Sequence, residues 1–105
     1  VLAFMPFGHS VPYNAAKAGI EQMAYTIATE LAPHRINVNV VEPGWVRTPL
    51  TERLPEAVRQ QALAETLLGQ LVEPEDVAAA VVFLSGSGSR RMTGQILRVD
   101  AGQYL

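Results

Sequence analysis

The sequence predicts an α/β fold in which helices cover a parallel sheet. Two short β-branched segments, residues 36–41 and 95–100, each follow a segment with helical periodicity, and no repeat or linker divides the 105 residues. Strands that alternate with crossover helices form parallel sheets. Two such strands need further neighbours, because parallel strands are buried on both faces. We therefore expect residues 1–105 to be part of a single domain whose other strands lie elsewhere.

The first predicted helix carries a regular apolar stripe. Pro12 suits its first turn and Pro33 ends it. Apolar residues recur at spacings of three and four, which is typical of an amphipathic helix with one buried face. These positions are Ile20, Met23, Ala24, Ile27, Ala28 and Leu31.

A strand and a long irregular segment follow. Residues 36–41 are β-branched and end at Pro43-Gly44, which indicates a strand that runs into a turn. Residues 55–68 have a weaker helical pattern within the long segment 48–70. A connection of that length between a strand and a helix is usually a binding loop or a lid.

The second clear helix begins at Pro74. Glu75 and Asp76 occupy its first turn, where the helix dipole favours negative charge. We expect its buried face to consist of Val77, Ala80, Val81 and Leu84. The Ser-Gly run at 85–89 predicts a turn, and residues 95–100 predict the last strand. The predicted order is helix, strand, lid, helix and strand.

Composition excludes several classes of protein. A net charge of −2 has the wrong sign for a nucleic-acid binder. The longest apolar run has eight residues, far fewer than the ~20 that a membrane span needs. The sequence has no cysteine, which fits a reducing cytosol, so we expect a cytoplasmic protein without a disulfide or a cysteine-bound metal. The chain opens on Val1 without a basic leader, which indicates a fragment.

Tyr13 and Lys17 are the first candidates for chemistry. They stand four residues apart at the start of the first helix, so both project from one face. An ammonium beside a phenol favours the phenolate and lowers the pKa of the tyrosine, which suits a general acid or base. The spacing alone is weak evidence, because many helices carry such a pair by chance.

Several blocks along the chain resemble the second half of the short-chain dehydrogenase/reductase family. They include Tyr-Asn-Ala-Ala-Lys at 13–17, Arg-Ile-Asn-Val-Asn-Val-Val at 35–41, Pro-Gly-Trp-Val-Arg-Thr-Pro at 43–49, Glu-Pro-Glu-Asp-Val-Ala at 73–78 and Thr-Gly-Gln at 93–95. Residues 39–45 are similar to glucose-dehydrogenase-like and 3-oxoacyl-acyl-carrier-protein-reductase-like members. The resemblance implies the C-terminal part of a Rossmann-like doubly wound parallel sheet.

The resemblance also implies NAD- or NADP-dependent hydride transfer between a nicotinamide and a small carbonyl or alcohol substrate. Tyr13 matches the catalytic tyrosine, and Lys17 matches the lysine that lowers its pKa and binds the nicotinamide ribose. Further cofactor-binding positions lie in the block after the strand, at Pro43, Gly44, Val46 and Thr48. The full-length protein is expected to be a homo-oligomer.

Other family elements are expected upstream of Val1. These are the Gly-rich phosphate-binding turn, the catalytic asparagine and the catalytic serine, which would fall one position before Val1. Ser10 is too close to Tyr13 to take that role. Without the Gly-rich turn, the chain alone is expected to be an inactive fragment that lacks the N-terminal cofactor-binding half.

Alternative functions are less well supported. Pro12 replaces the second glycine that a serine-hydrolase elbow requires, and His9 and His34 lack the spacing of metal ligands, so no metal is expected. Trp45 and Arg47 fit a substrate wall and simple packing equally well. The main rival is a non-catalytic chain, either a truncated product or an oligomerisation or interaction module. The sequence departs from the family pattern at two positions near the C-terminus: Ala101 replaces a glycine, and Arg91 replaces an aromatic or apolar residue.

Overall fold

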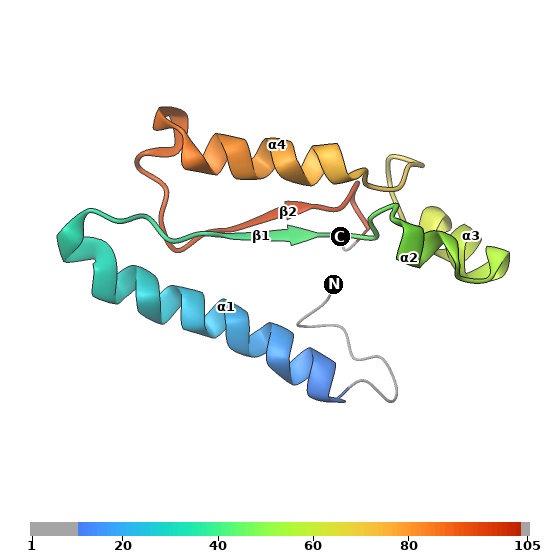
Figure 1. Cartoon of the computed structure of the whole chain (residues 1–105), viewed down its shortest axis with the longest axis horizontal. Helices are drawn as coiled ribbons and strands as arrows, with labels where there is room; N and C mark the ends of the chain where they lie inside the picture. The colour runs from blue at the N-terminus through green and yellow to red at the C-terminus, as the bar shows by residue number, and fades with distance from the viewer. Residues whose placement is uncertain (1–10, 104–105) are drawn as a thin grey trace.

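The computed structural model describes residues 11–103 (Figure 1). The first helix is followed by a short turn of 3-10 helix, a strand, the lid segment, a helix, a second 3-10 turn and a second strand. In chain order the elements are α1 (Val11–Leu31), η1 (Ala32–His34), β1 (Val40–Pro43), α2 (Pro49–Glu52), α3 (Glu56–Ala64), α4 (Pro74–Ser85), η2 (Ser87–Ser89) and β2 (Ile96–Val99).

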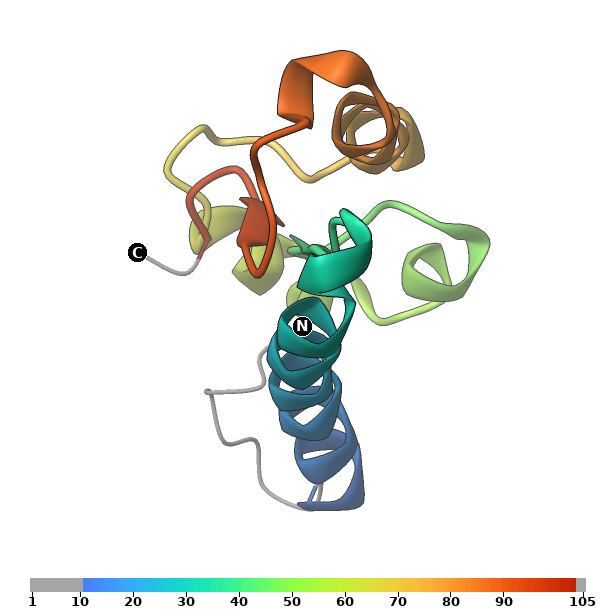
Figure 2. The same cartoon turned by 90° about the vertical axis from the view of Figure 1, so that its left-hand side faces the viewer.

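The two strands form a parallel sheet between two helices. Val40 pairs with Ile96 and Pro43 pairs with Val99. Figures 1 and 2 show α1 on one side of the sheet and α4 on the other. This arrangement confirms the predicted α/β class, with the carboxyl ends of both strands directed toward the same edge.

Helix α1 ends as predicted but buries less of its stripe than the periodicity indicated. Pro33 lies in η1, and Arg35 follows in the left-handed region with φ 58°. Ala24 and Ala28 are buried, whereas Ile20 is 45% exposed and Met23 55% exposed. The expectation that these last two side chains are buried was wrong. In Figure 1 the first half of α1 diverges from the sheet, so few neighbours cover its apolar side chains.

The first strand begins later than predicted. Residues 36–39 precede β1, which runs from Val40 to Pro43 instead of over 36–41. Two asparagine side chains within residues 36–39 bind the backbone of the segment that leads to β2. Asn37 donates to the carbonyl of Arg90 at 3.1 Å, and Asn39 donates to that of Met92 at 2.9 Å and accepts from the Gln95 amide at 3.0 Å. Because these side chains bind the opposing backbone, regular strand pairing starts only after them.

The lid contains two helices where one was predicted. Helix α3 is shorter than the predicted 55–68, and α2 had not been predicted. Helix α4 begins at Pro74 as predicted, and Glu73 and Asp76 cap each other at its start. Val81 was wrongly assigned to the buried face, since it is 48% exposed. The other three positions of that face are half-buried.

Two sequence-based expectations fall outside the described part of the chain, namely those for His9 and Ser10. His34 is exposed in η1, as expected for a surface histidine. Across residues 11–103 no helix is both long and apolar enough to cross a membrane. Within the same range, no three histidine or acidic side chains come together as a metal site would require.

Candidate functional site

Tyr13 and Lys17 lie in the first turns of α1. The Lys17 ammonium nitrogen is 5.4 Å from the centre of the Tyr13 ring, within the range of a cation–π contact. Tyr13 is 47% exposed and Lys17 is also exposed, so both polar groups are open to a ligand. The helical spacing therefore brings the two side chains together as the sequence predicted.

Lys17 also lies at the edge of the sheet. A groove of about 100 Å³ runs between α1 and β1, and both Lys17 and Pro43 line it. Pro43 is the last residue of β1. The structure thus brings the lysine close to the carboxyl end of the strand, which is where open α/β sheets bind their ligands.

Gly44 follows β1 and lies against the end of β2. A Cβ atom added to Gly44 would lie 2.8 Å from both Cα and Cβ of Asp100 and 3.0 Å from Oε1 of Gln103. The Gly44 amide also donates to the Val99 carbonyl at 2.9 Å. Only glycine permits this approach, and the approach fixes the direction in which the chain leaves the strand.

Val46 lies two residues after Gly44, and its two backbone groups differ in their partners. It forms a parallel bridge with Val72, in which Arg47 donates to the Val72 carbonyl at 2.8 Å and Val72 donates to the Trp45 carbonyl at 3.1 Å. The bridge uses the groups on either side of Val46, so the Val46 N–H and C=O point away from Val72. The carbonyl accepts from the Thr51 hydroxyl at 2.8 Å. Among the described residues, the N–H meets no acceptor.

Thr48 caps the short helix α2. Its hydroxyl accepts from the Thr51 amide at 3.2 Å, while the Thr51 hydroxyl accepts from the Thr48 amide at 2.8 Å. The two hydroxyl oxygens are also 3.2 Å apart. Because the Thr51 hydroxyl donates to the Val46 carbonyl, the Thr48 hydroxyl is the donor in this contact, and it would have to rotate away from Thr51 to donate to a ligand. The sequence reasoning missed Thr51, although the spacing of the two threonines is a capping signal.

The predicted cofactor-binding positions fall into two groups, one at the start of α1 and one at and after the end of β1. The open side-chain donors on α1 suit the hydroxyl groups of a ribose. The Val46 N–H, which has no acceptor within residues 11–103, suits a carboxamide oxygen, and the Thr48 hydroxyl lies two residues further on. This set of donors fits the nicotinamide end of NAD or NADP.

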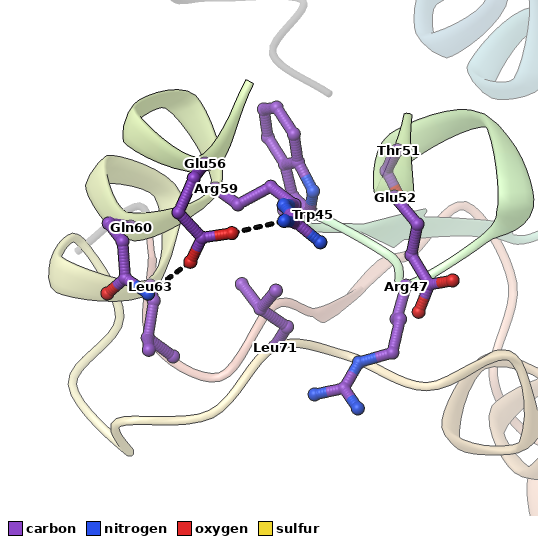
Figure 3. A pocket seen from close by; sticks show the side chains of 9 residues that line it. All are labelled: Trp45, Arg47, Thr51, Glu52, Glu56, Arg59, Gln60, Leu63 and Leu71. Carbon is purple, nitrogen blue, oxygen red and sulfur yellow. Dashed lines mark hydrogen bonds and ion pairs between the residues drawn. The ribbon is translucent and has the colours of Figure 1, made fainter. Parts of the chain in front are cut away.

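Trp45 and Arg47 line a neighbouring pocket of about 240 Å³, with the lid opposite them (Figure 3). Arg47 forms an ion pair with Glu73 at 3.3 Å. On the lid, Glu56 accepts hydrogen bonds from Gln60 and Arg59, and these two contacts, Gln60 first, lower the pKa of its carboxyl group. The position of Trp45 and Arg47 supports the interpretation as a pocket wall.

Another residue missed by sequence reasoning is Gln103, which is buried beside Gly44. Its Oε1 atom accepts from the Trp45 amide at 3.0 Å, and its Nε2 atom donates to Glu65 in the lid at 3.1 Å. It thus connects the chain after β1 with the lid. No local sequence signal identifies this role, because its partners lie 38 and 58 residues away.

Comparison with known proteins places these features in a family. The family model described as enoyl-(acyl carrier protein) reductase matches residues 2–103. The chain belongs to the short-chain dehydrogenase/reductase family. It is similar to the 3-oxoacyl-[acyl-carrier-protein] reductase of Thermotoga maritima, with 46% identity over 93 residues. It is also similar to the (3R)-3-hydroxyacyl-CoA dehydrogenase of Mus musculus, with 39% identity over 93 residues.

The solved structures agree with this assignment. The chain superimposes on the crystal structure of a 3-oxoacyl-[acyl-carrier protein] reductase from Brucella melitensis with a TM-score of 0.86 and 31% sequence identity. That match covers 89% of this chain and 35% of the other. The alignments with the two relatives named above cover 38% and 36% of the relatives' lengths, and each covers 89% of this chain. The family is therefore one of oxidoreductases with a Rossmann-like fold, and the chain spans less than half the length of these members.

Proposed function

We propose that this chain supplies the proton-transfer side chains and the nicotinamide end of the cofactor site in an NAD- or NADP-dependent oxidoreductase. The observation that carries the proposal is the Tyr13–Lys17 pair, with the ammonium 5.4 Å from the ring centre. In this proposal residues 1–105 form the C-terminal part of one Rossmann-like domain, and the phosphate-binding half precedes it.

Tyr13 and Lys17 have different roles in the proposed reaction. The Tyr13 hydroxyl gives a proton to the substrate oxygen during carbonyl reduction and takes it back during alcohol oxidation. The Lys17 ammonium stabilises the phenolate left at Tyr13 through its positive charge, and it binds the ribose hydroxyls. The nicotinamide, when bound, supplies or accepts the hydride.

The segment after β1 orients the cofactor. The Val46 N–H, which has no acceptor within residues 11–103, would hold the carboxamide oxygen, and the Thr48 hydroxyl, once turned from Thr51, would donate to the same end of the dinucleotide. Pro43 and Gly44 would line the nicotinamide end of the site. The Val72 bridge fixes the direction of the Val46 N–H before a ligand binds. Binding therefore needs little reorganisation of the backbone.

The names of the relatives suggest a class of substrate. Both 3-oxoacyl-[acyl-carrier-protein] reductases and (3R)-3-hydroxyacyl-CoA dehydrogenases are among them, so 3-oxoacyl and 3-hydroxyacyl thioesters are the first compounds to test. We also propose that the complete protein is a cytoplasmic homo-oligomer that binds neither nucleic acid nor membranes.

The deciding experiment replaces Tyr13 by Phe in the complete gene product that carries this chain. The change keeps the ring and removes the hydroxyl, so turnover should fall by roughly 10²- to 10⁴-fold, the contribution of a positioned acid or base. Tyr25→Phe is the matched control, since Tyr25 is 41% exposed on the same helix and lies three turns further along.

Turnover is measured with NADH and NADPH against 3-oxoacyl thioesters, and in the reverse direction with NAD and NADP. Wild-type activity in the Tyr13 variant would refute the assignment. Equal losses in both variants would show that the change acts through the helix and not through the tyrosine.

A further inference from the structure

The side chain of Gln103 lies where three segments of the chain meet. Gln103 is 8% exposed and belongs to the turn after β2. Its Oε1 atom accepts from the Trp45 amide, in the segment after β1, and its Nε2 atom donates to Glu65, in the lid. Both polar atoms of this buried side chain are therefore paired, each with a different segment. We refer to the two hydrogen bonds as the Gln103 bridge.

The Gln103 bridge joins two walls of the pocket of about 240 Å³ (Figure 3). Trp45 belongs to one wall, and helix α3 supplies the other through residues that include Arg59 and Leu63. Glu65 is the residue directly after α3. The distance between the segment after β1 and the end of α3 is thus spanned by one side-chain amide.

The turn that carries Gln103 is itself held by hydrogen bonds. The Gln103 amide donates to the Asp100 carbonyl at 3.0 Å, and the Asp100 carboxylate accepts from the Gly102 amide at 2.9 Å. The Ala101 carbonyl accepts from the Leu67 amide at 3.0 Å. Because a movement of Gln103 would break these contacts, its side chain is a fixed reference point for both of its partners.

Trp45 connects the Gln103 bridge to the Val46 N–H. The peptide unit between Trp45 and Val46 is planar, so the Val46 N–H points opposite to the Trp45 carbonyl. Val72 holds that carbonyl at 3.1 Å, and Gln103 holds the Trp45 N–H at 3.0 Å. With both backbone groups of Trp45 bound, the direction of the next N–H is set from two sides. Gly44 leaves room for this arrangement, since a Cβ atom there would lie 3.0 Å from Oε1 of Gln103.

We propose that Gln103 is a positioning residue that fixes the Val46 N–H through Trp45 and the lid wall of the pocket through Glu65. Loss of the bridge then weakens the binding of the cofactor and of a substrate in that pocket, although Gln103 touches neither. This inference rests on the proposed function, in which the Val46 N–H holds the nicotinamide carboxamide.

The first test exchanges the two side chains in the complete gene product. Gln103→Glu keeps an acceptor for the Trp45 amide but places a second carboxylate against Glu65. Glu65→Gln alone keeps an acceptor for Gln103. In the double variant the amide at position 65 donates to the carboxylate at position 103, so the bridge forms in the reverse direction with the net charge of the wild type. Gln70→Glu is the matched control, because it adds the same charge at an exposed position of the lid.

Steady-state kinetics measures the KM for NADH or NADPH and the KM for a 3-oxoacyl thioester. Gln103→Glu should raise both KM values by roughly five- to tenfold, the contribution of one hydrogen bond. The double variant should return both toward the wild type, and Glu65→Gln and Gln70→Glu should keep wild-type values. A residue that only stabilised the fold would lower the active fraction, and therefore kcat, with both KM values unchanged.

The second test needs no turnover. Gln103→Leu keeps the approximate size of the side chain and removes both hydrogen bonds. Amide hydrogen exchange at Trp45 and at Leu67 should then become roughly fivefold faster or more, whereas the amides of α4 should exchange at the wild-type rate. Leu67 is informative because its amide binds Ala101 and not Gln103, so its exchange reports on the lid.

The outcomes separate this inference from the proposed function. A double variant with KM values as high as those of Gln103→Glu would overturn the bridge, and so would wild-type KM values in Gln103→Glu. Equally faster exchange in α4 would show a general loss of stability and would also overturn it. If the wild-type protein turned over no thioester with either cofactor but showed the expected exchange changes, the proposed function would be refuted and the link between the two walls supported.

Discussion

Replacing Gly44 by Ala should disturb both the stability and the cofactor site of this protein. The added Cβ would lie 2.8 Å from Cα of Asp100, and a backbone atom cannot rotate away as a side-chain tip can. The strand end or the following loop must therefore shift. Inserting one methyl group into a closely packed site typically costs about 1–3 kcal/mol. The same shift would move the Val46 N–H, so we also expect a higher KM for the cofactor.

The matched control is Gly19→Ala. Gly19 lies inside α1, and a Cβ there would meet no atom within 4 Å. Alanine is the better helix former, so this change should stabilise the protein by about 0.5–1 kcal/mol. Urea unfolding of the complete gene product measures both free energies of unfolding, and steady-state kinetics measures the cofactor KM. If the Gly44 variant had the same free energy of unfolding as the Gly19 variant, the close approach of Gly44 to Asp100 would not contribute to stability.

Three further predictions follow from individual features. Ala101 has φ 54°, in the left-handed region, which strains alanine but not glycine. Ala101→Gly should therefore raise the free energy of unfolding, measured by urea titration, by about 1 kcal/mol. A loss of stability would contradict this. Lys17→Met keeps the length of the side chain and removes its charge, so kinetics should show a lower kcat together with a higher cofactor KM, and unchanged values of both would mark Lys17 as a surface residue. The 105-residue chain by itself should show no saturable binding of NADH or NADPH in fluorescence titrations, because the cofactor contacts proposed above reach only the nicotinamide end. Tight binding would show that this part binds the cofactor alone.

Local signals predicted the two long helices well. Pro33 ends α1, and Pro74 with the acidic residues after it begins α4, because backbone restriction and the helix dipole act within one turn. The start of β1 was not predictable in this way. Asn37 and Asn39 bind backbone groups more than 50 residues away, so the place where they interrupt the strand depends on a partner that a local pattern does not contain.

Ala101 shows what a departure from a family pattern can mean physically. Its replacement of a glycine is visible in the sequence, but the reason that glycine is preferred there is a positive φ, which only the structure reveals. The carbonyl of Ala101 accepts from the amides of Leu67 and Leu68, at 3.0 and 3.1 Å, and these contacts hold the lid to the end of β2. These two hydrogen bonds fix the conformation of the turn, so Ala101 keeps a left-handed backbone that is strained for alanine.

The two halves of the candidate site differ in how far a sequence can foresee them. Tyr13 and Lys17 meet because they are four residues apart on one helix, so spacing suffices. The Val46 N–H has no acceptor in the described part of the chain, because Val72, 26 positions later, binds the groups on either side of it, and no local pattern encodes that bridge. Substitutions in the first half should therefore change the chemistry and spare the fold, whereas substitutions around the bridge should change cofactor affinity and stability together.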